Sequence, residues 1–209
     1  MSQYNHHDGL TTLAEALQCR QVGADTRASS PLLPIDTGAA CLPKRLTGFT
    51  VAESKNTQWN RKFDTLKECL GRGILAAFVG PCGTGKSQLA VSLAKCAMHD
   101  GKSALHVEAM ELCENVKDTF SGDESAKQVL YRYTRPSLLI IDEVNRGLSQ
   151  YDTRLVQRVV SRRYDSFRDT ILISNETPEE FSTLVGDRVI SRINDTGKVH
   201  LFTWPNFRQ

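Results

Sequence analysis

A glycine-rich segment between an apolar run and a helical pattern places the tightest constraint on the fold of this chain. The segment begins at Gly80, after the apolar run ILAAFV, and ends at Lys86 and Ser87, which lead into the helical stretch QLAVSLAKCAMHDG. Its spacing matches GxxxxGK[ST], in which glycines let consecutive backbone N–H groups point at phosphate oxygens. The N-terminus of the following helix adds partial positive charge. The segment therefore predicts a strand–loop–helix unit that binds a nucleoside triphosphate.

The residue types in this loop indicate how each would act. Lys86 is expected to reach the β- and γ-phosphates, and Ser87 is expected to ligate Mg²⁺. The alternative is a chance glycine-rich turn, and the flanking strand and helix patterns argue against it. The predicted nucleotide-binding residues are Gly80, Pro81, Cys82, Gly83, Thr84, Gly85, Lys86, Ser87 and Gln88. Cys82 occupies a variable position of the motif and is assigned no particular role.

Apolar strand patterns alternate with helical patterns from about residue 57 onward. Strands are expected at ILAAFVG, SALHVEA, SLLIIDEV, TILISN and KVHLFTW, with helices between them. One of these helices is expected to run through TPEEFSTLVGDRVISRI, with Thr177 as N-cap, Pro178 as first residue and Glu180 closing a capping box. Such alternation is typical of a mostly parallel sheet with helices on both faces. The predicted fold class is α/β, with a mostly parallel five-stranded sheet.

The first 45 residues lack the regular alternation of strand and helix patterns that marks the rest of the chain. The stretch GADTRASSPLLPIDTGAACLP has no helical or strand period and indicates a linker. Residues 10–20 have capping-box spacing and leucines on one face, so they predict a short helix that either docks on the domain or binds a partner. We therefore expect a flexible N-terminal segment over 1–45 and one nucleotide-binding domain over 46–209.

Composition restricts the location of this domain and the kinds of site that it can carry. Apolar residues make up 40% and charged residues 24% of the 209 residues, as in globular proteins. No apolar run approaches the roughly 20 residues of a membrane span, and no signal-peptide pattern opens the chain, so a cytoplasmic location without membrane contact is expected. The six cysteines form no CxxC pair, which argues against a zinc site and a disulfide framework. Because the net charge is only +2, a DNA contact must depend on local residues.

Acidic and amide side chains follow two later strands. Asp142 and Glu143 end the apolar run LLII, and Asn175 ends TILIS. In a doubly wound sheet, ligands bind at the carboxyl ends of the strands. Asp142 is expected to hold Mg²⁺ through water, Glu143 to polarise the attacking water, and Asn175 to hydrogen-bond the γ-phosphate and that water. The second carboxylate favours a hydrolysing ATPase over a kinase, which transfers phosphate to a substrate group.

Arginines recur at four-residue spacing on two predicted helices. Arg188 and Arg192 in GDRVISRI share one helix face. They are either a surface pair or arginine fingers that reach the ATP of a neighbouring subunit, in which case hydrolysis would depend on assembly. A second basic stripe, on an earlier helix, is expected to be a solvated face and comprises Arg154, Arg158, Arg162 and Arg163.

Five segments together resemble one branch of the AAA+ ATPases. KDTF at 117–120, LLIIDEV, ILISNETPEEF, LVGDRVISRI and the closing VHLFTWPNFRQ have the order and spacing of the DnaC-type replicative helicase loaders, in the DnaC/IstB branch. The resemblance covers about residues 45–209, and KDTF and the closing segment are its most specific parts. It implies a P-loop AAA+ (ASCE) ATPase core over 46–209 without a sizeable C-terminal lid domain, bound to ATP or ADP and Mg²⁺.

The resemblance also implies roles for individual residues. Lys117 and Phe120 lie where these loaders face single-stranded DNA, so Lys117 would meet phosphate and Phe120 would stack on a base, the alternative being that Phe120 packs in the core. The segment TGFTV at 47–51 matches the part that covers adenine. The implied ATPase residues are Lys86 and Ser87 of the P-loop, the Walker B pair Asp142 and Glu143, the sensor-1 residue Asn175, the arginine finger Arg192 with Arg188 beside it, and the sensor-2-like Arg208.

The implied function is an ATP-dependent loader that delivers a hexameric, DnaB-like replicative helicase onto single-stranded DNA as a homo-oligomeric spiral or ring. Residues 1–45 show no match to the region with which such loaders grip the helicase. The alternative is an IstB-like transposition helper that acts on duplex DNA with a transposase. A third hypothesis is a nucleotide-binding adaptor with little hydrolysis, against which the complete Walker B and sensor residues argue. A small-molecule kinase fits least, because no Arg-rich lid segment is visible.

Overall fold

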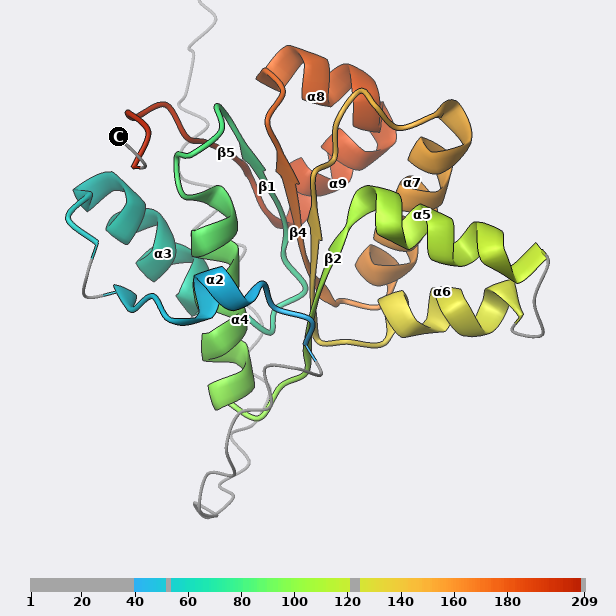
Figure 1. Cartoon of the computed structure of the whole chain (residues 1–209), viewed down its shortest axis with the longest axis horizontal. Coiled ribbons are helices and arrows are strands. Elements are labelled where there is room, and N and C mark those ends of the chain that lie inside the picture. The colour runs from blue at the N-terminus through green and yellow to red at the C-terminus, as the bar shows by residue number, and fades with distance from the viewer. Residues whose placement is uncertain (1–39, 52–53, 121–124, 208–209) are drawn as a thin grey trace, which may run out of the picture. The chain divides into compact units, whose positions relative to one another are not determined.

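A five-stranded, fully parallel sheet forms the centre of the computed structural model, which describes residues 40–51, 54–120 and 125–207 (Figure 1). Its strands lie in the order β2-β3-β4-β1-β5, and each neighbouring pair is parallel. The predicted α/β class and the number of strands are confirmed. The strands are β1 (Leu75–Val79), β2 (Ala104–Glu108), β3 (Leu138–Asp142), β4 (Asp169–Ser174) and β5 (Val199–Leu201).

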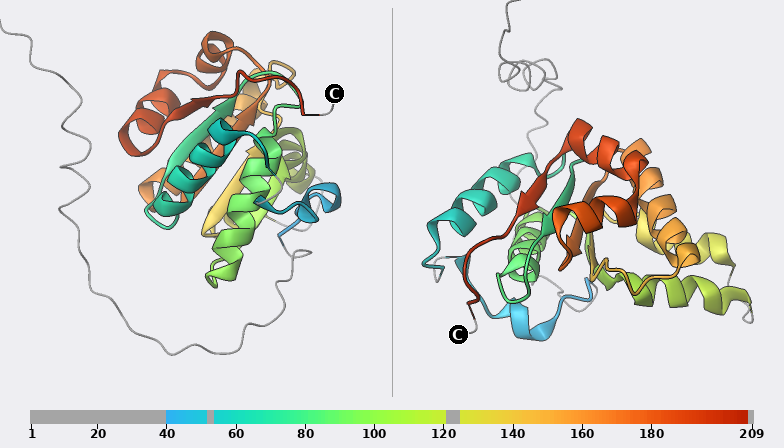
Figure 2. Two further views of the ribbon diagram at one scale, coloured as in Figure 1. Left: turned by 90° about the vertical axis from the view of Figure 1, so that its left-hand side faces the viewer. Right: turned by 90° about the horizontal axis from the view of Figure 1, so that it is seen from above.

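Helices cover both faces of the sheet (Figures 1 and 2). One face carries α2 (Lys44–Thr47), α3 (Thr57–Cys69) and α4 (Lys86–His99). The other carries α5 (Ala109–Lys117), the short 3-10 helix η2 (Asp118–Phe120), α6 (Ala126–Thr134), α7 (Gln150–Asp165), α8 (Pro178–Val185) and α9 (Asp187–Thr196). Because the sheet is covered twice, every residue of β1 and β4 is buried, which explains the unbroken apolar sequence of β1 and the apolar centre of β4. Among the described helices, none is long and apolar enough to cross a membrane.

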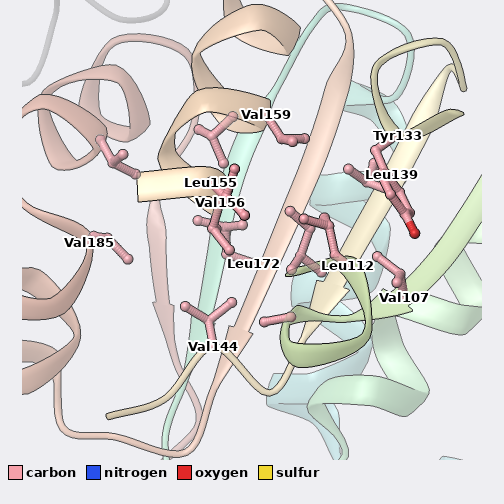
Figure 3. Close-up of a cluster of buried hydrophobic side chains, with 14 of the residues drawn as sticks. Val107, Leu112, Tyr133, Leu139, Val144, Leu155, Val156, Val159, Leu172 and Val185 are labelled. Atoms are coloured by element: carbon pink, nitrogen blue, oxygen red, sulfur yellow. The ribbon is translucent and has the colours of Figure 1, made fainter. Parts of the chain in front are cut away.

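Two separate cores lie on the two faces of the sheet, because successive side chains of a strand point to opposite faces. The core between the sheet and helices α5 to α9, drawn in part in Figure 3, includes Val107, Leu112, Leu139, Val159 and Leu172. The core on the side of α2, α3 and α4 includes Trp59, Phe63, Phe78, Leu89 and Phe202. Neighbouring positions of β1 illustrate the division: Ala77 belongs to the first core and Phe78 to the second.

The last predicted helix begins as expected but is wrong in its length. The Thr177 side chain accepts the Glu180 backbone N–H, the Glu180 side chain accepts the Thr177 N–H, and Pro178 is the first helical residue. The helix then stops at Gly186, whose φ of 77° and ψ of 161° lie outside the helical region. Such a backbone favours glycine, which has no Cβ to clash. The segment therefore forms two helices, α8 and α9, and Arg188 and Arg192 both lie on α9.

The described chain begins inside the segment that was predicted to be a linker. Ala40 and Leu42 are buried in the core beside α4, and the Ala40 carbonyl accepts the backbone N–H of His106 on β2 at 2.9 Å. The domain core thus uses residues that precede the predicted boundary at residue 46. All described residues fall within one compact unit, Pro34–Gln209. The predicted helix over 10–20 lies outside the described residues.

The predicted solvated face on α7 is wrong for Arg163, which is fully buried, whereas Arg154, Arg158 and Arg162 are exposed. The Arg163 guanidinium joins the end of α7 to the α6–β3 connection and to the start of β4. Its hydrogen-bond acceptors are the backbone carbonyls of Tyr133, Thr134, Pro136, Ser137 and Asp169 and the hydroxyl of Thr170. This cluster lies at the amino-terminal edge of the sheet, away from the glycine-rich loop.

Candidate nucleotide site

The glycine-rich loop connects β1 to α4 and has the backbone that its glycines predict. Gly83 and Gly85 have φ angles of 79° and 83°, in the left-handed region that favours glycine. A Cβ at Gly83 would collide with the Asn206 side chain, and a Cβ at Gly85 would collide with the Phe207 ring. The backbone angle therefore favours glycine at both positions, and a Cβ at either would also displace a side chain of the tail.

Lys86 is the first residue of α4, and its side chain is folded back into the loop. The Lys86 Nζ donates to the carbonyl oxygens of Gly80 at 2.6 Å and Pro81 at 2.7 Å. Burial lowers the pKa of Lys86, while the nearby Cys82 and Asp142 oppose this effect. Because the ammonium group is already bound by two oxygen acceptors inside the loop, it can exchange them for phosphate oxygens.

Ser87 and Asp142 meet at the carboxyl edge of the sheet. The Ser87 Oγ donates to Asp142 Oδ2 at 2.7 Å, and the Glu143 backbone N–H donates to Asp142 Oδ1 at 2.8 Å. Burial raises the pKa of Asp142, but hydrogen bonds from His106, Ser87 and the Glu143 backbone outweigh it and lower the pKa below its usual value. A hydroxyl beside an ionised carboxylate provides the hard oxygen ligands that Mg²⁺ prefers. The residues present therefore fit the metal that the loop motif implies.

His106 is a member of this cluster that the sequence did not single out. Its Nε2 lies 3.4 Å from Asp142 Oδ2, and the side chain is buried on β2, next to β3. A histidine inside the apolar run ALHV was the available signal, because a buried polar side chain requires a partner. The sequence did not indicate which partner, since the pairing of β2 with β3 decides it.

Glu143 follows Asp142 with a backbone that is uncommon for a residue other than glycine. Its φ is 57°, in the left-handed region. The turn is held by the Glu143 N–H on Asp142 and by the Val144 N–H on the Ile173 carbonyl at 2.9 Å. Burial, together with the carboxylates of Glu108 and Asp142, raises the pKa of Glu143. Such backbone strain concentrates at functional sites, and a raised pKa makes the carboxylate a stronger base.

Asn175 follows β4, the strand that lies between β1 and β3. The register pairs Val79 of β1 with Ser174 and Ile141 of β3 with Leu172. Because the three strands are parallel, Asn175 lies at the edge where β1 enters the glycine-rich loop and β3 ends at Asp142. The sheet thus brings the loop, the acidic pair and the exposed Asn175 side chain to one place.

A pocket of about 260 Å³ adjoins the loop on the side of α3. Phe49 packs edge-on against Trp59, with ring centroids 5.7 Å apart, and both line the pocket. The other lining residues are Ser54, Lys55, Asn56, Gly85, Gln88 and Phe207. That residues 47–51 cover adenine stays a prediction, and of that segment Phe49 lines this pocket beside Gly85.

The two arginines of α9 differ in their surroundings. Arg188 is exposed and lines a surface groove with Arg154 and Arg158 of α7. Arg192 is only 13% exposed and packs over the Tyr164 ring at 5.1 Å from its centroid, with a terminal nitrogen 3.9 Å from Asp165 Oδ1. Tyr164 and Asp165 end α7, just before β4 begins, so Arg192 lies toward the amino-terminal edge of the sheet. Neither arginine belongs to the cluster around Asp142 in its own subunit.

Lys117, which was predicted to face DNA, already has an anionic partner. Its Nζ lies 2.6 Å from Asp152 Oδ1, and the Asp152 side chain is 4% exposed and also accepts the Ser149 hydroxyl. This ion pair joins the end of α5 to the first turn of α7. The side chain of Phe120 and the whole of Arg208 lie outside the described residues.

Comparisons with known proteins are consistent with this geometry. The family model of the IstB-like ATP binding protein matches residues 62–195. The chain is 32% identical over 162 residues to the replicative helicase loader DnaC of Escherichia coli K12. That alignment covers 75% of this chain and 63% of the relative, so the chain spans less than two thirds of the length of the relative.

Solved structures share the fold. The crystal structure of the DnaC helicase loader has a TM-score of 0.64 at 20% identity, with 78% of this chain and 100% of that chain covered. AMPPCP-bound DnaA from Aquifex aeolicus has a TM-score of 0.60 at 20% identity, covering 77% of this chain and 51% of that chain. The predicted P-loop AAA+ fold is confirmed. Of the residues described, only 202–207 follow β5, and they form no helical lid.

Proposed function

This chain belongs to the family of IstB-like ATP-binding proteins, and on that premise we propose that it is an ATP-dependent loader of a hexameric, DnaB-like replicative helicase. The observation that carries the proposal is the 32% identity to DnaC over 162 residues. The loader would deliver the helicase onto single-stranded DNA in the cytoplasm, as a homo-oligomer. The nucleotide site supports an ATP-driven step in that delivery.

The residues at the carboxyl edge of the sheet support ATP hydrolysis. Lys86 would leave the loop carbonyls and bind the β- and γ-phosphates, while Ser87 and Asp142 would hold Mg²⁺. The metal ion, when bound, neutralises charge on the phosphate oxygens. Glu143 would accept a proton from the attacking water at its carboxylate, and the Asn175 amide would orient that water toward the γ-phosphate.

We also propose that Arg188 is the residue that reaches the ATP of a neighbouring subunit. The resemblance assigns that role to Arg192, but the Arg192 guanidinium is already packed on Tyr164 and beside Asp165. Arg188 lies one helical turn earlier on α9 and is exposed. Arg192 would then hold α9 against α7 and so position Arg188.

Arg188→Ala is expected to lower the ATPase rate of the assembled protein by about 10²-fold or more, because an arginine finger contributes about 10³–10⁵ in kcat. Steady-state phosphate release would measure it. Mixing Arg188→Ala with Lys86→Ala subunits should restore part of the activity, since each variant supplies what the other lacks. Arg154→Ala, in the same groove, is the matched control and should lose far less. Full activity in Arg188→Ala, or no recovery on mixing, would contradict the assignment.

A second candidate function is an IstB-like transposition helper that acts on duplex DNA with a transposase. The family model that matches residues 62–195 favours it, because that model describes IstB-like proteins. An adaptor that binds nucleotide and hydrolyses little is a third, and the convergence of Glu143 and Asn175 on the loop argues against it.

The proposed helicase-loading function predicts that single-stranded DNA stimulates the ATPase and that the full chain retains a hexameric helicase in a pull-down. Removal of residues 1–39 should abolish helicase retention if the partner site lies in the N-terminal segment. The cut is placed there because Ala40 and Leu42 are core residues, so the remaining domain keeps its packing. Stimulation by duplex DNA alone, with no helicase retained, would replace the loader with the transposition helper. ATPase activity that no DNA changes would contradict both.

A further inference from the structure

Both tryptophans of the chain donate their indole N–H groups to the backbone of the glycine-rich loop. The Trp59 Nε1 donates to the Gly85 carbonyl at 3.1 Å, and the Trp204 Nε1 donates to the Thr84 carbonyl at 2.9 Å. The backbone N–H of Phe207 donates to the Gly83 carbonyl at 3.0 Å. Three consecutive carbonyls of the loop therefore each have a donor from α3 or from the tail, and the Gly85 carbonyl also accepts the backbone N–H of Leu89 on α4 at 2.9 Å.

These donors come from opposite ends of the domain and meet at the loop. Trp59 lies on α3, 26 residues before Gly85, and Trp204 lies in the tail after β5, 120 residues after Thr84. In Figure 1 the tail runs from β5 back past the loop between β1 and α4, toward α3. The loop is thus held between an element that precedes it and an element that closes the fold.

Aromatic packing fixes the orientation of both indoles. Trp59 is 1% exposed and stacks on Phe63, with centroids 5.8 Å apart and ring planes at 4°. Trp204 is 9% exposed, with its ring centroid 4.9 Å from that of Phe202 and 6.4 Å from that of Phe207. An indole offers one donor and no acceptor, so a rigid indole holds a carbonyl at one place and in one direction.

The direction of these carbonyls matters for phosphate binding. A phosphate-binding loop works by pointing consecutive backbone N–H groups at the ligand. A carbonyl and the N–H of the next residue belong to one planar peptide unit and point in opposite directions. Holding the carbonyls of Gly83, Thr84 and Gly85 outward therefore turns the N–H groups of Thr84, Gly85 and Lys86 the other way.

We propose that Trp59 and Trp204 are positioning residues for ATP binding, which act by orienting the loop peptides through the Gly85 and Thr84 carbonyls. The tail 202–207 then belongs to the nucleotide site, because it supplies the N–H groups that donate to the Thr84 and Gly83 carbonyls. The proposal depends on ATP binding by the loop and is independent of helicase loading. Its test therefore needs neither DNA nor a helicase.

Trp59→Phe and Trp204→Phe each keep an aromatic ring and remove one N–H. Each is expected to raise the Kd for Mg-ATP, measured by titration calorimetry, by about 3- to 10-fold, the effect of one hydrogen bond. Tyr133→Phe is the matched control: it removes a hydroxyl that accepts the Asn115 side-chain N–H at 2.8 Å in the other core. Tyr133→Phe should lower the melting temperature by about as much as each tryptophan variant does, and should leave the Kd for Mg-ATP unchanged.

A second measurement covers the case in which one of these variants fails to fold. Because the chain has only two tryptophans, replacing tryptophan throughout by its benzothienyl analogue removes both indole N–H groups and nearly preserves ring shape. The analogue-substituted protein is expected to bind Mg-ATP about 10- to 100-fold more weakly than the unmodified chain. The proposal is overturned if the analogue protein, or both phenylalanine variants, bind Mg-ATP with wild-type Kd while their melting temperatures fall as in Tyr133→Phe.

Discussion

Glu143→Gln is expected to bind ATP with near wild-type affinity and to hydrolyse it about 10²–10³-fold more slowly. Glutamine has the shape of glutamate but cannot accept a proton from the attacking water. The left-handed backbone at this position, with φ of 57°, costs glutamine no more than glutamate, so the turn after Asp142 should persist. Titration calorimetry would measure ATP affinity, and phosphate release would measure turnover.

Glu108→Gln is the matched control for this prediction. It removes a carboxylate that helps to raise the pKa of Glu143, but Glu108 carries no proposed part in the reaction. Turnover at pH 8 should change little. A base must be deprotonated to act, so the rate falls as the pH drops through the pKa of Glu143. Because Glu108→Gln lowers that pKa, the fall should move to lower pH. Equal turnover in Glu143→Gln and the wild type would remove Glu143 from the mechanism.

Arg163→Met is expected to lower the free energy of unfolding by about 3–5 kcal/mol, the range seen when one partner of a buried charged network is removed. The methionine side chain fills part of the volume but donates no hydrogen bond. The partly buried carbonyls of Pro136 and Ser137 and the buried carbonyl of Asp169 would then lose the donor that holds them. Burial lowers the pKa of Arg163 to about 9, which still leaves the guanidinium charged at neutral pH. Urea denaturation would measure the loss.

Arg162→Met provides the control, because Arg162 is exposed and precedes Arg163 on the same helix. A surface substitution of this kind should change the free energy of unfolding by no more than about 0.5 kcal/mol. Arg163→Lys keeps the charge but loses the planar set of donors, and should lie between the two. At a temperature where Arg163→Met is folded, its Kd for ATP should be unchanged, since the cluster lies at the far edge of the sheet. A loss below about 1 kcal/mol in Arg163→Met would contradict the structural role.

The burial of Arg163 could have been predicted from helical periodicity. Val156, Val159 and Val160 are buried, and Arg163 continues their spacing of three, four and seven residues. The charge of Arg163 is typical of a solvated helix face, but its position in the helical period places it with the core residues. For Arg192 the sequence carried no such signal, because its packing on Tyr164 depends on how α9 crosses α7.

The sequence by itself determined the parts of this protein that depend on local spacing. The loop from Gly80 to Ser87 follows from glycine positions, and the placement of Asp142 and Asn175 at one edge follows from a rule common to all parallel sheets, that the strands end at the same edge. Only the tertiary structure decided which distant groups hold this edge in place: His106 on Asp142, and the two indoles on the loop carbonyls. For the two indoles the reason is physical, because a hydrogen bond to a backbone carbonyl places no demand on the side chain of the residue that carries it. The accepting position therefore leaves no trace in the sequence, and the donor is known only when the chain has folded.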